Sequence, residues 1–256
     1  MTNEYKNFIK KKKKEKRNII IIQFLITFLF ILLWELLARK NIINSFITSS
    51  PSNIIKTLIN LYNQNDLFVH ILITIKEIII SFIITSTTSL LISTLLYNYK
   101  TISIIIDPYL TILNSLPKVA LGPLIIICFG ANTKSIIIMA ILISIIISIQ
   151  NIYNGFKNTD KNKIKLLKTL NATKKDILFK LVLPSNKNTI LNTLKINISM
   201  CTIGVIQGEL LTSKAGIGYL ITYGTQVFNL DLVMSSIIIL TIVSYILYLI
   251  ITKIKI

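Results

Sequence analysis

Long apolar segments limit what this chain of 256 residues can fold into. Six such segments occupy residues 19–37, 71–97, 101–130, 135–152, 189–211 and 233–251. A helix of about 20 apolar residues crosses the hydrocarbon core of a bilayer, and it satisfies its backbone hydrogen bonds internally. The composition agrees, with 53% hydrophobic residues, 15% charged residues and a mean hydropathy of +0.71. The sequence therefore predicts an all-α, polytopic membrane protein with six transmembrane helices.

Lysine and arginine are unevenly distributed among the segments that join these spans. Residues 1–18 hold eight, residues 157–187 hold nine, and Lys100, Lys253 and Lys255 bring this side of the membrane to twenty. The other side holds five, which are Arg39, Lys40, Lys56, Lys134 and Lys214. Cytoplasmic loops are enriched in Lys and Arg. We therefore expect a cytoplasmic polybasic tail over residues 1–18, a transmembrane domain over residues 19–256, and both termini in the cytoplasm.

The net charge of +18 would by itself suggest nucleic acid binding. Because the charge lies in segments that flank apolar runs, it favours contact with membrane lipids instead, and we expect no nucleic acid partner. A basic head before an apolar run also resembles a signal peptide. Residues 19–37 are longer than the apolar core of a signal peptide, and no small-residue cleavage site follows. An uncleaved first span is therefore predicted.

Two features of the polar connections and span ends are predicted from local pattern. Residues 52–62 are expected to form a short helix capped by Ser50 or Ser52 around a turn at Pro51. Lys76 and Glu77 fall in the first turns of the second span, where charged side chains can reach the membrane interface.

Residues 101–130 are apolar but contain several helix breakers. Pro108, Pro117 and Pro123 each remove a backbone donor, and Gly122 precedes the last of them. Free backbone groups at membrane depth are tolerated only where protein or a watery cavity meets them. Two interpretations follow: a kinked helix with no further role, or a broken helix that lines a solute path.

The fifth span carries a small-residue motif and one carboxylate. Gly204 and Gly208 form a GxxxG pattern, which permits close contact between helices. Glu209 follows directly, and a carboxylate at mid-bilayer costs about 2.5 to 3.5 kcal/mol, so it should face the bundle interior or a polar cavity. Gly216 and Gly218 mark turns in the segment that comes next.

Residues 157–187 form a basic connection that predicts two short helices. Ile164, Leu167 and Leu170 recur at helical spacing and give the first helix one apolar side. Asn171 suits the left-handed conformation that ends a helix. Thr173 and Asp176 form a capping box that starts the second helix, which Pro184 is expected to end. We therefore expect a compact hairpin that fits a groove on another protein.

This hairpin resembles the cytoplasmic coupling loop of importer-type ABC transporter permeases. The family pattern is an acidic residue with two alanines, then a glycine, then Ile-x-Leu-Pro. The matching positions are Lys165, Leu166 and Leu167, then Asn171, then Leu181, Leu183 and Pro184. The triplet and the glycine are thus replaced in this chain.

Two further stretches resemble the same family: residues 117–124 with Phe129–Gly130, and Glu209 with residues 216–220. Their order and spacing resemble the branch that carries sulfonates, taurine, nitrate and related small solutes, and the resemblance runs from about Trp34 to the C-terminus.

The resemblance implies a permease subunit of the cell membrane that is driven by a separate ABC ATP-binding subunit and supplied by an external solute-binding protein. ATP and magnesium would bind the ATPase, so this chain would hold no cofactor and no metal. Two ATPase grooves call for two hairpins, which predicts a homodimer. The expected coupling residues are Lys165, Leu166, Leu167, Lys168, Leu170, Asn171, Ala172, Thr173 and Pro184. The expected path residues are Pro117, Gly122, Pro123, Gly204, Gly208, Glu209, Gly216 and Gly218.

Missing motifs argue against intrinsic catalysis. The sequence has no P-loop, one histidine and two cysteines without metal-binding spacing, so we expect no enzyme activity. One alternative is an ion-coupled secondary transporter or channel, which would need more intramembrane charges than Glu209 and an interfacial Lys76–Glu77 pair. Another is a membrane-anchored interaction protein with a basic, lipid-binding hairpin. The transported solute is not predicted.

Overall fold

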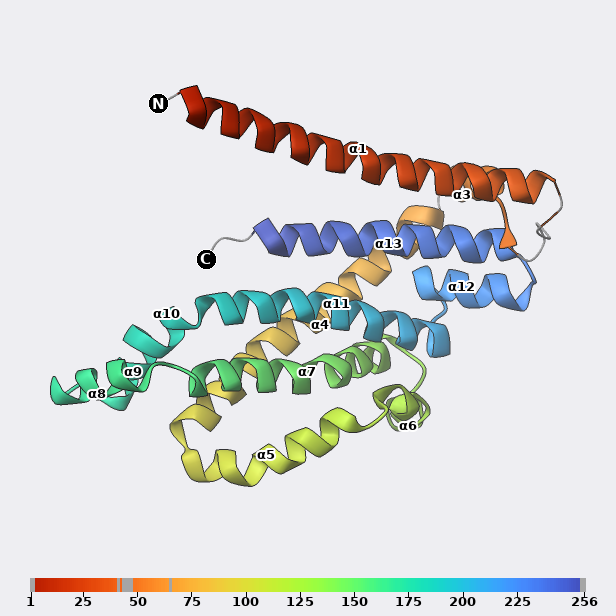
Figure 1. The fold of residues 1–256 in the computed structure, drawn as a ribbon. Helices are drawn as coiled ribbons and strands as arrows, with labels where there is room; N and C mark the ends of the chain where they lie inside the picture. Colours follow the sequence, from red (N-terminus) through yellow and green to blue (C-terminus); the bar gives the residue numbers. More distant parts are fainter. Residues whose placement is uncertain (1–2, 41, 43–47, 65, 254–256) are drawn as a thin grey trace.

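The computed structural model describes residues 3–40, 42, 48–64 and 66–253, and the regular structure within them is helical (Figure 1). The longer helices are α1 (Asn3–Arg39), α3 (Pro51–Asn63), α4 (Asp66–Asn98), α5 (Lys100–Ser115), α6 (Gly122–Phe129), α7 (Thr133–Lys157), α11 (Lys187–Thr212), α12 (Ile217–Gln226) and α13 (Leu230–Lys253). Shorter elements are the 3-10 helix η1 (Lys118–Leu121), α8 (Lys161–Thr169), α9 (Lys174–Ile177), the π-helix η2 (Leu178–Val182) and α10 (Leu183–Ser185).

Five helices in the described ranges are long and apolar enough to cross a membrane: α1 from Arg17 onward, α4, α7, α11 and α13. A sixth crossing is possible only as a bent pair, in which α5 and the η1–α6 segment meet at 87°. The all-helical prediction with about six spans is confirmed, and the expected break in residues 101–130 is present. It lies at Leu116–Pro117, whereas Pro108 is accommodated inside α5.

The centre of the bundle is formed by α7 and α11, with α4 packed against both. Gly204 of α11 faces α7 so closely that a Cβ there would lie 2.4 Å from the Cα of Ala140. Gly208 faces the same helix, and its Cβ would lie 2.9 Å from the Cα of Ile136. The GxxxG pattern therefore brings two backbones together, as small residues do between membrane helices.

Hydroxyl groups of α4 pair with polar groups of α7 and α11 inside this core. Thr85 and Ser144 share a hydrogen bond of 3.0 Å, and the Sγ of Cys201 donates to Ser144 at 3.5 Å. The side chain of Asn197 accepts from Ser148 and donates to Ser86. These bonds satisfy polar groups that neither water nor lipid could reach, so they fix the rotation of each helix about its axis.

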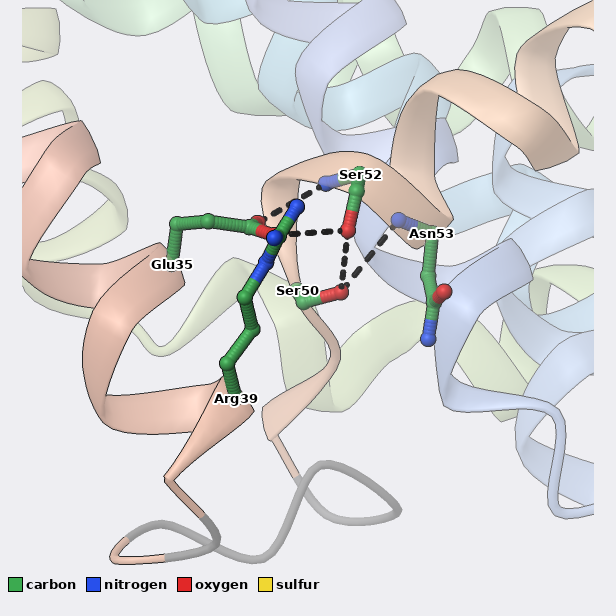
Figure 2. A network of polar contacts seen from close by, with 5 residues as sticks. All are labelled: Glu35, Arg39, Ser50, Ser52 and Asn53. Atoms are coloured by element: carbon green, nitrogen blue, oxygen red, sulfur yellow. Dashed lines mark hydrogen bonds and ion pairs between the residues drawn. The ribbon is translucent and has the colours of Figure 1, made fainter.

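The C-terminal end of α1 contacts α3 through one carboxylate (Figure 2). Glu35 accepts from Arg39 at 2.6 Å, and it accepts from the backbone N of Ser52 at 3.1 Å and from its hydroxyl at 2.9 Å. Ser50 caps α3 by accepting from the N of Asn53, which confirms the predicted short helix. The most apolar part of α1, within Arg17–Arg39, is 0% buried. This helix therefore leaves its apolar surface to lipid or to another chain.

The start of α1 and the end of α13 lie at one end of the bundle together with the α8–α9 hairpin, while α12 and α6 lie at the other end (Figure 1). Helix α1 is continuous from Asn3 to Arg39, so the polybasic stretch and the first span form one helix.

Candidate functional site

The basic hairpin of residues 157–187 closes its first helix as the sequence predicts. Asp160 caps α8 by accepting from the N of Asn162 at 2.8 Å. Asn171 has φ of 58°, so the expected left-handed residue is confirmed. The N of Ala172 donates to the carbonyl of Leu167 at 3.0 Å, which satisfies a carbonyl in the last turn.

The second helix begins with the predicted capping box. The hydroxyl of Thr173 accepts from the N of Asp176 at 3.2 Å, and a carboxylate oxygen of Asp176 accepts from the N of Thr173 at 3.1 Å. Lys180 forms an ion pair of 2.6 Å with the other carboxylate oxygen.

The expected end of this helix at Pro184 is wrong. Helical structure continues through the π-helix η2 and through α10, in whose first turn Pro184 lies. Helical structure ends at Ser185, one residue beyond this proline. The chain turns at Asn186 instead, and the amide of Asn186 donates to the Thr159 hydroxyl at 2.8 Å.

The hairpin has its own small core. Ile152 and Phe156 at the end of α7 pack with Ile177, Leu178 and Val182, and none of these side chains is more than 5% exposed. Partly buried residues against this core include Ile164, Leu167 and Ala172. A hairpin that is stabilised internally can keep its shape when it contacts another protein.

Three apolar residues of the hairpin are left outside its core: Leu166, Leu170 and Phe179 are 61%, 69% and 64% exposed. Leu170, which the sequence places on the apolar side of the first helix with Ile164 and Leu167, is thus exposed, whereas those two are partly buried. Helix α8 ends at Thr169, and Leu170 at its C-cap turns away from Ile164 and Leu167. Lys165, Lys168, Asn171, Thr173 and Pro184 are also exposed.

The capping box should make the hairpin sensitive to acid. The ion pair with Lys180 and the bonds from Thr173 lower the pKa of Asp176 from 3.8 to about 2. A lowered pKa in the folded state contributes stability above pH of about 4, and this contribution is lost as the pH falls through about 2. The protection factors of amides 173–180, which are exchange rates corrected for the intrinsic pH dependence, should therefore be constant above pH of about 5 and should fall below about 4.

Two variants isolate this carboxylate. Asp176→Asn should show the faster exchange already at neutral pH, with little further change on acidification. Lys180→Met should leave the capping box in place and give an intermediate result. An unchanged acid dependence in Asp176→Asn would assign the effect to other carboxylates.

The second candidate site surrounds Glu209, where α11 meets the start of α12. Thr74 of α4 donates to one carboxylate oxygen at 2.6 Å, and the N of Gly218 donates to the other at 2.6 Å. The N of Ile217 in turn donates to the Thr74 hydroxyl at 2.8 Å. Glu209 is 1% exposed, which confirms that it faces the bundle interior. A carboxylate at a helix N-terminus is favoured by the free N–H groups and the helix dipole.

Both glycines of this turn make room for that carboxylate. Gly216 has φ of +117°, and a Cβ there would lie 2.2 Å from Oε1 of Glu209. A Cβ on Gly218 would lie 2.6 Å from the Cβ of Glu209. The N of Gly216 donates to Nδ1 of His70 at 2.9 Å, and the His70 ring stacks on Tyr219. Residues of both α4 and α11 therefore fix the position of this turn.

The interfacial position expected for Glu77 is wrong. Its side chain is 2% exposed, whereas the side chain of its neighbour Lys76 is exposed. The missed signal is a polar stripe along one face of α4, in which Thr74, Glu77, Ser81, Thr85 and Ser89 recur every three or four residues. All five are 2% exposed or less.

The remaining expected path residues are placed apart. Gly122 at the start of α6 is buried, and a Cβ there would lie 2.7 Å from Cδ1 of Leu211 and 3.0 Å from Cε of Met139. Pro117 and Pro123, which flank it, are exposed. Lys118 in the break donates to the carbonyl of Ile143 at 3.3 Å. Glu209, Gly216 and Gly218 thus form one cluster, Gly204 and Gly208 join α7 to α11, and Gly122 attaches the bent segment to both helices.

The fold and the hairpin define a class: a multi-pass helical membrane protein in which a basic helical hairpin joins two central spans. Residues 87–254 match the model of the family described as binding-protein-dependent transport system inner membrane component. The chain belongs to this family. It is an inner-membrane permease subunit of a binding-protein-dependent ABC importer, which disfavours both the secondary-transporter or channel and the interaction-protein alternatives.

Individual relatives agree with this assignment. The chain is 28% identical over 224 residues to a probable ABC transporter permease protein of Haemophilus influenzae, covering 88% of this chain and 91% of the relative. It is 25% identical over 235 residues to a putative aliphatic sulfonates transport permease protein of Bacillus subtilis, covering 92% and 85%. A structure of the MetNI methionine ABC transporter in inward-facing conformations shares the fold, with a TM-score of 0.65, 16% identity and coverage of 73% of this chain and 93% of that chain.

Proposed function

We propose that residues 157–187 couple this permease to its ATP-binding subunit. The observation that carries the proposal is the division within the hairpin: Leu167 and Ala172 pack on its own core, while Leu166 and Leu170 project outward between lysines. Apolar side chains on a rigid helical hairpin are anchors of the kind that insert into a groove on a partner. ATP and magnesium bind the partner, and this chain holds neither a cofactor nor a metal.

The orientation follows from the charge distribution. The hairpin, the start of α1 and the end of α13 lie at the end of the bundle that carries most of the lysines, and this supports a cytoplasmic location for all three (Figure 1). The opposite end, with α12 and the start of α7, then faces the external solute-binding protein. A small solute passes between these ends along a path whose expected residues include Pro117, Gly122 and Glu209.

The direct test is reconstitution. The permease, an ATP-binding subunit and a binding protein are placed in proteoliposomes, and uptake is measured for a panel of sulfonates, nitrate, a thiamine-precursor pyrimidine and amino acids. We expect uptake that depends on ATP and on the binding protein. Uptake without ATP that follows an ion gradient would contradict the importer function.

A homodimer is the expected assembly. Each chain offers one hairpin, and an ATPase pair with two-fold symmetry offers two grooves. The uncovered apolar surface of α1 agrees with additional contacts in the membrane. Native mass spectrometry of the detergent-solubilised complex should therefore show two copies of this 29.0 kDa chain with two ATPase subunits. An active complex with a single copy would contradict the dimer.

A further inference from the structure

A cavity of about 390 Å³ lies at the hairpin end of the bundle, where the end of α4, the start of α5, the end of α7 and α8 meet (Figure 1). Three cavity lysines line it: Lys100 begins α5, Lys157 ends α7 and Lys161 begins α8. All three are exposed, and within the described ranges no carboxylate forms an ion pair with any of them. Like charges around one cavity repel each other, so an anion between them would be stabilising.

The helices that carry the cavity lysines are tied together by buried hydroxyl groups. Ser103 of α5 and Tyr153 of α7 line the cavity and share a hydrogen bond of 2.7 Å. Thr159, which lies between α7 and α8, also lines the cavity and accepts from the amide of Asn186 at 2.8 Å. The positive charges therefore lie on elements whose relative positions are fixed, as a binding site requires.

The apolar part of the lining continues onto the surface of α5. Ile104 lines the cavity and is exposed, and Ile105 and Ile112 on the same helix are exposed as well. Helix α5 belongs to the bent pair that is apolar enough to lie in a membrane, so this surface is suited to hydrocarbon. The cavity lysines lie at the end of the bundle where the phosphate groups of the adjacent leaflet would be. A ligand with one phosphate and apolar chains fits both parts of the lining.

We propose that this cavity binds an anionic glycerophospholipid from the leaflet on the hairpin side, with the cavity lysines around its phosphate and its acyl chains along α5. A soluble phosphate ester carries a similar anion but has nothing to cover the apolar side of α5. The site is separate from the coupling contact, because Leu166 and Leu170 lie at the other end of α8. The bound lipid would link the start of α5 to the end of α7 and to the hairpin.

Asp107 is the one carboxylate among the residues that line this cavity, so three positive charges and one negative charge leave +2. It follows Lys100 by two helical turns on α5, which places it about 10 Å further along the helix axis. A phosphate near Lys100 is then about one Debye length from this carboxylate, and the repulsion between them is small. Asp107→Asn should therefore strengthen lipid binding by less than about threefold.

The test is a lipid titration of the detergent-solubilised permease–ATPase complex, followed by native mass spectrometry. The probes are phosphatidylglycerol, phosphatidylcholine with the same acyl chains, glycerol 3-phosphate and inorganic phosphate. Phosphatidylglycerol should bind as one molecule per permease chain, at least about tenfold more tightly than the other three probes. Replacing the cavity lysines together with glutamine should weaken phosphatidylglycerol binding by at least about tenfold.

The hairpin offers a matched control. Lys163, Lys165 and Lys168 of α8 are exposed and lie outside the cavity lining. Replacing them with glutamine removes the same charge and should leave tight phosphatidylglycerol binding in place. Replacing the cavity lysines with arginine keeps their charge and should retain the lipid. Because all these side chains are exposed, every variant should unfold at the normal temperature in phosphatidylcholine, which excludes a folding artefact.

Four results would overturn the proposal. Undiminished phosphatidylglycerol binding after glutamine replacement of the cavity lysines would place the lipid elsewhere. An equal loss in the matched control would reduce the effect to the overall charge of this end of the bundle. Equal affinity for glycerol 3-phosphate or inorganic phosphate would assign the cavity to a soluble anion. Equal affinity for phosphatidylcholine would leave the cavity lysines without a role in lipid selection.

Discussion

Replacing Gly204 with leucine should abolish the folded permease. A Cβ at this position would lie 2.4 Å from the Cα of Ala140 and 3.2 Å from its N, so α7 and α11 would have to separate. Overpacking that only rotates side chains costs about 1 to 3 kcal/mol, and a clash with backbone cannot be relieved in that way. We expect little monodisperse protein in size-exclusion chromatography and a large drop in the thermal unfolding temperature of what remains.

Two variants on the same helix calibrate this effect. Gly208→Ala places a Cβ 2.9 Å from the Cα of Ile136 and should be destabilising but less severe. Ser199→Leu adds the same leucine at an exposed position and should fold normally. If Gly204→Leu is produced at the level of Ser199→Leu with the same unfolding temperature, the two helices are not held at the distance described here.

The spans were predictable because hydropathy over about 20 residues does not depend on tertiary contacts. The break at Pro117 was predictable for a similar reason, since a missing backbone donor acts locally. Pro108 shows the limit of this argument. It lies within α5, so a proline in an apolar segment marks a position where a helix can break but does not have to break.

Glu77 was misplaced because averaging over a window hides which face of a helix a residue occupies. Its neighbour Lys76 and its place near the start of the span favoured an interfacial position. The polar stripe from Thr74 to Ser89 carried the opposite information, since hydroxyl groups that recur on one helical face mark the side that packs on other helices. Only the structure shows that Glu209 of α11 lies opposite this stripe.

The prediction of the hairpin is accurate where hydrogen bonds between neighbouring residues determine the structure. It is less accurate where the structure depends on the exact residue at which a helix ends. The capping box and the left-handed Asn171 depend on neighbouring residues, and both are present. The orientation of Leu170 depends on whether α8 includes it. Because the helix ends one residue earlier, the stripe that contains Ile164 and Leu167 does not continue, and Leu170 is 69% exposed.

This difference determines which variant tests the coupling function. Leu167→Asp would place a charge against Phe156, Ile177 and their neighbours and would unfold the hairpin whether or not it binds a partner. Leu166→Asp combined with Leu170→Asp alters two side chains that are more than 60% exposed, so the hairpin itself should remain intact. If these side chains enter an ATPase groove, each aspartate becomes a buried charge without a partner there, which costs about 3 to 5 kcal/mol.

We therefore expect the Leu166→Asp, Leu170→Asp double variant to lose its ATP-binding subunit during co-purification and to lose ATP-dependent uptake, while its membrane spans unfold at the normal temperature. Asn171→Val should give a related loss by distorting the turn, because a β-branched residue resists positive φ.

The lysines of α8 supply the opposing test. Lys161, Lys163, Lys165 and Lys168 are all exposed, and surface charges of this kind contribute little to a groove contact that depends on apolar anchors. Neutralising all four should lower the rate of association at low salt and leave a stable complex. A hairpin that only binds anionic lipid should behave in the reverse manner. In that case the lysine variant would lose its function and the double leucine variant would retain its ATPase, which would remove the coupling role from this hairpin.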